Sequence, residues 1–153
     1  MKKHKCLLTS LLLLPVLYVA TVQAEGKSPA ETLNGYAAVR TALTHGKSLS
    51  VVIDFGRCDG AKSLNMMGGM PIGSFLVLTP GDARSEYLTF SEYHQMLSEK
   101  EATPSVEYVR YKVTQDDTVT LDVHRYLTGT AQTMPPVTYH CKMNTAARFY
   151  RQK

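Results

Sequence analysis

The stretch from residue 105 to residue 127 constrains the fold more than any other part of the chain. It has two arms, and in each arm apolar and polar side chains alternate. The apolar positions are Val109, Tyr111 and Val113, then Val119, Leu121 and Val123. Alternation with a period of two, in β-branched and aromatic residues, is typical of a half-buried strand. The two arms therefore predict an antiparallel hairpin.

The length of the loop decides the register of this hairpin. A two-residue loop would place each apolar residue opposite a polar one, whereas a three-residue loop over 115–117 pairs Val113 with Val119. Because a slip of one residue moves every side chain to the other face, the three-residue loop is favoured. The same register pairs Arg110 with Asp122 and Glu107 with Arg125, and such opposite-charge pairs stabilise a sheet.

The remaining elements are weaker predictions. A capping box at Ser28 and Glu31, with Pro29 in the first turn and Gly46 after the last, predicts a helix over 29–45. Strands are expected over 49–55, 72–78, 85–90, 137–142 and 147–151, a loop over 56–70, and one or two helical turns over 92–99 after Ser91. The expected fold is α+β, with the N-terminal helix packed on an antiparallel sheet of about six strands. A small half-open β-barrel is the alternative.

The first 24 residues have the three parts of a secretory signal: a basic start, an apolar run over 6–22, and the exit Val22-Gln23-Ala24. The run is shorter and less uniformly apolar than the roughly 20 residues that a spanning helix needs. We therefore expect cleavage near Ala24, a periplasmic or secreted protein with no permanent membrane span, and a single domain over 25–153.

Cleavage also changes the charge. The whole chain has 17 Lys and Arg against 13 Asp and Glu, a net charge of +4. The signal removes three lysines and no acidic residue, which leaves a net charge of +1. No basic cluster remains, so nucleic acid is not an expected partner.

Cys58 and Cys141 are the cysteines of the mature chain. In an oxidising compartment such a pair is more often a disulfide than two thiols. The alternative is a nucleophilic Cys58, with Arg57 lowering the pKa of the thiol and Asp59 opposing it.

Two places can hold polar ligand contacts. Asp54 and Arg57 lie at the end of a predicted buried strand, where Asp54 more commonly shapes the turn. Glu107 and Arg125 fall on the apolar face of the hairpin, where the pair either binds a polar ligand group or neutralises itself at the edge of the core. His94 is a further candidate.

Neither a metal nor a cofactor is expected. Met66, Met67 and Met70 offer soft thioethers for Cu(I), but methionine is also a common apolar filler. His94, His124 and His140 lack the close spacing of a zinc site, and His124 and His140 are expected on the polar face of their strands.

The chain resembles the VirK family of exported bacterial proteins. The resemblance lies in the signal, the strand 51–55 leading to Cys58, Gly68-Gly69, Tyr87 to Ser91 with His94, the strand 107–113, and Cys141 before Arg148-Phe149-Tyr150. It implies a small periplasmic or secreted protein tied to virulence regulons, and it brings no catalytic residues.

Two functions follow as hypotheses. The first is a non-enzymatic module that binds a protein or a small ligand. The second is an envelope enzyme built on Cys58 or the histidines, for which the sequence offers no recognised catalytic motif.

Overall fold

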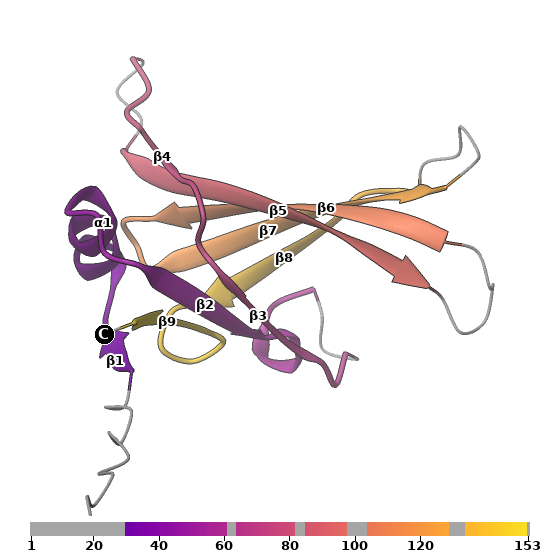
Figure 1. Ribbon diagram of the computed structural model, residues 1–153, viewed down its shortest axis with the longest axis horizontal. Coiled ribbons are helices and arrows are strands. Elements are labelled where there is room, and N and C mark those ends of the chain that lie inside the picture. The colour runs from indigo at the N-terminus through magenta and orange to yellow at the C-terminus, as the bar shows by residue number, and fades with distance from the viewer. Residues whose placement is uncertain (1–29, 61–63, 82–84, 98–103, 129–133, 153) are drawn as a thin grey trace, which may run out of the picture.

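The structure is a computed structural model that describes residues 30–60, 64–81, 85–97, 104–128 and 134–152 (Figure 1). The predicted signal peptide, Ser28 and Pro29 lie outside these residues. In chain order the elements are β1 (Glu31–Leu33), α1 (Tyr36–Thr44), β2 (Leu49–Asp54), the 3-10 helix η1 (Phe55–Arg57), β3 (Met67–Pro71), β4 (Leu76–Leu78), β5 (Tyr87–Leu97), β6 (Pro104–Thr114), β7 (Thr118–Leu127), β8 (Val137–Lys142) and β9 (Ala147–Arg151).

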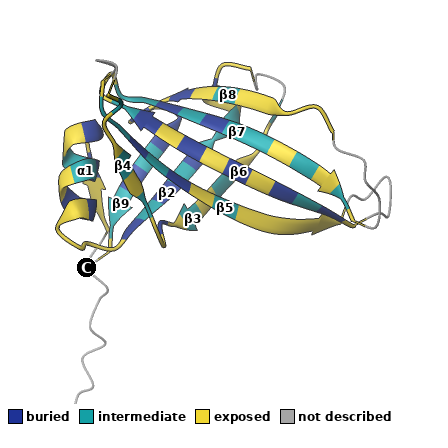
Figure 2. Cartoon of the chain, turned by 90° about the horizontal axis from the view of Figure 1, so that it is seen from above, coloured by how far each residue is buried: buried dark blue, intermediate teal, exposed yellow. Residues whose placement is uncertain are grey.

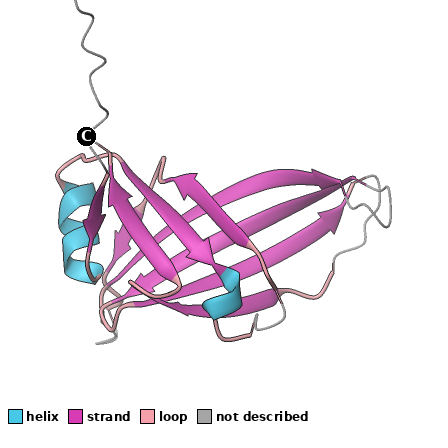
Figure 3. Cartoon of the chain, turned by 90° about the horizontal axis from the view of Figure 1, so that it is seen from below, coloured by secondary structure: helices cyan, strands magenta, loops and turns pink. Residues whose placement is uncertain are grey.

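The described strands form two antiparallel sheets. One has four strands in the order β1-β9-β2-β3, and the other has five in the order β4-β5-β6-β7-β8. The prediction of an α+β fold with a helix on a single sheet of about six strands is therefore wrong, and so is the half-open barrel. The sheets differ in length, and the long strands β5, β6 and β7 extend beyond the four-stranded sheet (Figures 1 and 3).

Two sheets form because two separate sets of alternating strands each have an apolar face to bury. In β2, Leu49, Val51 and Ile53 are buried while their neighbours are not. In β6, Val109, Tyr111 and Val113 are buried in the same way (Figure 2). Phe90 of β5 meets Phe149 of β9 edge to face, with ring centroids 6.5 Å apart, so the two apolar faces share one core.

The predicted hairpin is confirmed residue by residue. β6 and β7 pair Val113 with Val119, Tyr111 with Leu121 and Val109 with Val123 across a three-residue loop. Asp117 takes the left-handed conformation that the loop requires, with φ 60°. Its carboxylate Oδ1 then accepts a hydrogen bond of 2.7 Å from the N–H of Tyr36, the first residue of α1.

The helix is shorter than predicted. α1 begins at Tyr36, because Glu31 to Leu33 pair with β9 as strand β1 and Gly35 (φ 84°) turns the chain between them. The predicted capping box is therefore replaced by the distant Asp117. The end agrees with the prediction: Gly46 has φ 71°, and the N–H groups of Gly46 and Lys47 donate to the carbonyls of Leu43 and Ala42.

Strand β5 replaces the predicted helical turns over 92–99. All eleven of its residues pair with β6, from Tyr87 opposite Thr114 to Leu97 opposite Pro104. The long free edge of β6 outweighs the weak helix preference of this segment. In consequence one face of β5 points inward along its whole length. It begins with Leu88 and Phe90 and continues with Glu92, His94 and Met96.

Candidate ligand-binding cavity

A cavity of about 450 Å³ lies between the two sheets where they diverge. Its wall on the side of the four-stranded sheet includes Val51, Ile53 and Phe55, and its wall on the other side includes Val109 and Val123. The volume lies within the range of small-molecule sites, which are mostly apolar with a few polar groups that fix the orientation of the ligand. This cavity has that composition.

The polar groups form a row across three strands. His94 of β5 is paired with Glu107 of β6, which is paired in turn with Arg125 of β7. Arg125 Nε donates a 2.6 Å hydrogen bond to Glu107 Oε1, and Nη2 donates to the same oxygen. His94 Nε2 lies 3.1 Å from Glu107 Oε2. The Glu107 side chain is 10% exposed, against 40% for Arg125 and 46% for His94. The carboxylate is thus buried, and both of its oxygens are occupied.

A second polar pair lies deeper. The Tyr111 hydroxyl donates a 2.7 Å hydrogen bond to Glu92 Oε1. Burial, together with this hydrogen bond and the charge of Glu92, raises the pKa of the Tyr111 phenol far above its usual value. The phenol therefore stays protonated and acts as a donor.

Methionines Met66, Met96 and Met134 line the cavity from three separate segments. The three methionines weighed as Cu(I) ligands, Met66, Met67 and Met70, are split, because strand alternation turns Met67 outward at 62% exposure while Met70 packs against the core. Flexible thioether side chains suit a site that adapts to the shape of an apolar ligand.

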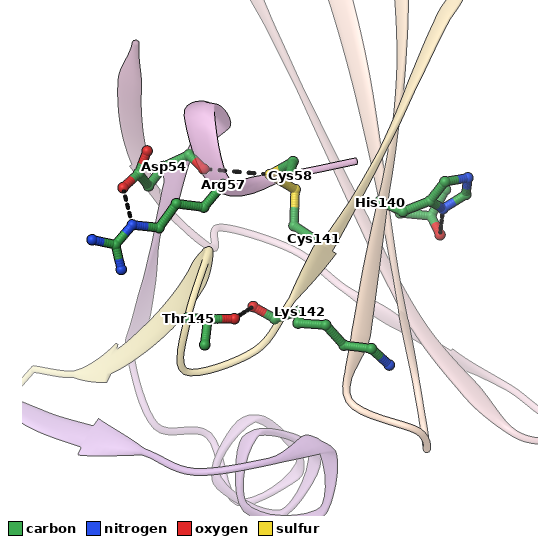
Figure 4. Close-up of a disulfide and its surroundings, with 8 residues drawn as sticks. Asp54, Arg57, Cys58, His140, Cys141, Lys142 and Thr145 are labelled. Atoms are coloured by element: carbon green, nitrogen blue, oxygen red, sulfur yellow. Dashed lines mark hydrogen bonds and ion pairs between the residues drawn. A yellow bond between two sulfur atoms is a disulfide. The ribbon is translucent and has the colours of Figure 1, made fainter. Parts of the chain in front are cut away.

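Asp54 and Arg57 do not contribute to the cavity. They form a local ion pair, with Arg57 Nε 3.0 Å from Asp54 Oδ2, beside η1 (Figure 4). Of the five candidate residues, the cavity therefore contains His94, Glu107 and Arg125, whereas Asp54 and Arg57 lie outside it.

Cys58 and Cys141 lie at disulfide distance, with Cα atoms 4.4 Å apart (Figure 4). Cys58 follows η1 and Cys141 lies in β8, so the pair links the end of one sheet to the edge of the other. Beside it, Asp59 and His140 exchange backbone hydrogen bonds of 2.8 and 3.1 Å. Both cysteines are at most 1% exposed. This geometry suits a structural bridge and gives no support to an accessible thiolate at Cys58.

The three histidines do not converge. His94 lines the cavity, whereas His124 and His140 lie on the opposite face of the five-stranded sheet, where His140 Nδ1 is 3.2 Å from Thr120 Oγ1. Within the described ranges, no group of three or more His, Cys, Asp and Glu residues is placed to hold a metal ion. The same ranges contain no helix that is long and apolar enough to cross a membrane.

Sequence reasoning missed much of the cavity. The sequence predicts helical turns for Glu92 and Met96. Leu88 and Phe90 alternate on the inward face, and the same alternation carried along the strand turns Glu92 and Met96 inward as well. Gly68 and Phe55, on the opposite wall, carry no local signal, because their place in the cavity depends on how the two sheets pack.

The arrangement defines a class of protein: a small two-sheet β-protein with an apolar cavity between the sheets and, on its wall, an ion pair with a buried carboxylate. The VirK protein family model matches residues 32–131, and the chain belongs to the VirK family. It is 26% identical over 105 residues to the uncharacterized protein y4wH of Sinorhizobium fredii. The matched segment covers 66% of this chain and 67% of that protein.

A solved structure has the same fold. The crystal structure of lpg1832, a VirK family protein from Legionella pneumophila, matches with a TM-score of 0.65 at 18% identity. The match covers 77% of this chain and 97% of the Legionella chain.

Proposed function

We propose that this VirK protein is an exported, non-enzymatic binding module that takes up a small molecule with an apolar body in the cavity between its sheets. One observation carries the proposal: a cavity of about 450 Å³, apolar on both walls, is crossed on one wall by the row His94, Glu107 and Arg125. The polar groups of this row are already paired with one another. They are therefore suited to hold and orient a ligand rather than to exchange protons with it.

Gly68 provides a direct test, because it lies on the cavity wall in β3. A Cβ atom added to Gly68 would meet Phe55 Cε2 at 3.6 Å, an ordinary contact, so the backbone accepts a side chain there. A leucine would occupy the cavity. We expect Gly68→Leu to weaken binding of a neutral apolar fluorophore, N-phenyl-1-naphthylamine, at least about tenfold, as one overpacked contact does. Fluorescence titration measures the effect.

Gly73 supplies the matched control. It is exposed, a Cβ atom there would meet nothing within 4 Å, and it does not line the cavity. Gly73→Leu should leave the affinity for the fluorophore unchanged. Equal affinity in wild type, Gly68→Leu and Gly73→Leu would show that the fluorophore binds elsewhere and would refute the proposal.

Export and a role in host association complete the proposal, and they rest on the signal-like first 24 residues and on VirK family membership. The intact mass of protein recovered from the periplasm or medium should correspond to a chain that begins at Glu25. A deletion strain should recover host association with the wild-type gene and not with Gly68→Leu. Recovery of the uncleaved chain would contradict export with cleavage of a signal. Full rescue by Gly68→Leu would contradict a role of the cavity in host association.

A further inference from the structure

We infer that the ligand of this cavity is an amphiphile with an anionic head, and that Arg125 binds this head while the apolar tail lies deeper between the sheets. The inference rests on the proposed function and adds to it the chemical class of the ligand. It follows from the order in which charges are buried along one row of the five-stranded sheet.

On the cavity wall the guanidinium of Arg125 is more accessible than the carboxylate beside it. The Glu107 side chain is 10% exposed and Arg125 is 40% exposed. Glu107 Oε1 accepts from Arg125, and Oε2 lies 3.1 Å from His94 Nε2. Each oxygen of the Glu107 carboxylate therefore already has a nitrogen neighbour, Arg125 at Oε1 and His94 at Oε2. A cationic head would therefore find this carboxylate covered.

Arg125 keeps donors for a further partner. Its guanidinium has five N–H groups. The contact with Glu107 uses two of them, the N–H of Nε and one N–H of Nη2. Nη1 lies 4.0 Å from Met134 Sδ, and a thioether is a weak acceptor. Within the described ranges Nη1 has no stronger partner. A carboxylate, sulfate or phosphate oxygen would replace this contact with a charge-assisted hydrogen bond.

Glu92 is the charge that opposes an anion here, and its position limits the opposition. Glu92 lies on β5, two strands away from Arg125 on β7, and two residues further along the strand than His94. With the usual distances between strands and along a strand, the Cα atoms of Glu92 and Arg125 are about 12 Å apart. Its Oε1 is also held by the Tyr111 hydroxyl. An anionic head at Arg125 is thus remote from Glu92, and the space between Ile53, Val109 and Val123 remains for the tail.

Three ligands with the same ten-carbon chain separate the head from the tail: decanoate, decanol and decyltrimethylammonium. Displacement of N-phenyl-1-naphthylamine from the wild-type protein is measured for each, below the micelle concentration of the two ionic ligands and the solubility limit of decanol. We expect decanoate to bind at least about tenfold more tightly than the other two, the size of one charge-assisted hydrogen bond. Equal affinities, or preference for the ammonium, would overturn the inference while leaving the proposed function standing. Failure of all three ligands to bind would overturn both.

Variants assign the preference to Arg125. In Arg125→Gln the tenfold preference for decanoate should disappear while the affinity for decanol stays within about twofold. Arg125→Gln leaves Glu107 without its main partner. The double variant Glu107→Gln/Arg125→Gln is therefore measured as well, because it removes both charges and is expected to keep the fold. Arg110→Gln, on the outward face of β6 in an exposed pair with Asp122, is the control and should keep the preference. A preference that survives in the double variant would overturn the role of Arg125.

Discussion

Replacement of both Cys58 and Cys141 by serine is expected to lower the free energy of unfolding by about 4–5 kcal/mol, by loop-closure entropy. The two residues are 83 positions apart, so the bridge closes the chain from β3 to β8 into one loop. It also joins the sheets beside the cavity, where Phe55 and Tyr139 meet edge to face with ring centroids 5.5 Å apart. A loss of this size is close to the whole stability of many small domains.

Urea unfolding of the oxidised wild type and of Cys58→Ser/Cys141→Ser measures this loss. The wild type kept in a thiol reductant should unfold at the same midpoint as the double variant, since both lack the bridge. If the double variant and the oxidised wild type unfold within about 1 kcal/mol of each other, the bridge does not hold the sheets together as described.

Replacement of Arg125 by methionine is expected to lower the free energy of unfolding by about 3 kcal/mol, the low end for breaking a buried ion pair. The low end applies because Arg125 is itself 40% exposed and because His94 remains beside Glu107. The loss arises from Glu107, whose carboxylate stays buried after its main partner has gone.

The double variant Glu107→Met/Arg125→Met distinguishes a lost ion pair from lost packing. It removes the buried charge together with its partner, so its stability should return to within about 1 kcal/mol of wild type. Arg110→Met on the exposed face serves as the matched control and should change stability by no more than about 0.5 kcal/mol. A double variant less stable than Arg125→Met alone would contradict this explanation.

The sequence predicts the β6–β7 hairpin completely, because apolar alternation fixes which face is buried and the loop length then fixes every pair. The same argument placed Glu107 and Arg125 together on the buried face, where the structure has them. Strand β2 is predictable for a similar reason, because Leu49, Val51 and Ile53 alternate along one face and that face is the buried one.

The errors all arise where contacts between distant segments decide the structure. Residues 92–97 form a strand because β6 offers an edge, and α1 starts at Tyr36 because β9 recruits Glu31 to Leu33 into a strand. The division into two sheets depends on β2 pairing with β9, nearly a hundred residues away along the chain.

The candidate site was half predictable for the same reason. Glu107 and Arg125 are paired in the predicted hairpin, so strand register alone places them. His94 joins their row only because residues 92–97 form a strand instead of the predicted helical turns. The opposite wall, with Phe55 and Gly68, is supplied by the other sheet. No local pattern predicts which residues of two sheets will face each other across a cavity.

The chain carries its own reporters for the central claim, that the cavity between the sheets is a ligand site. The methyl groups of Met66, Met96 and Met134 line the cavity, while Met67 is turned outward and Met143 is buried in the core outside the cavity. In a protein labelled with ¹³C at the methionine methyl groups, N-phenyl-1-naphthylamine should shift the resonances of Met66, Met96 and Met134 through the ring currents of its aromatic rings. Those of Met67 and Met143 should stay in place. Shifts at Met67 or Met143 without shifts at the three cavity methionines, or no shifts at all, would contradict the claim.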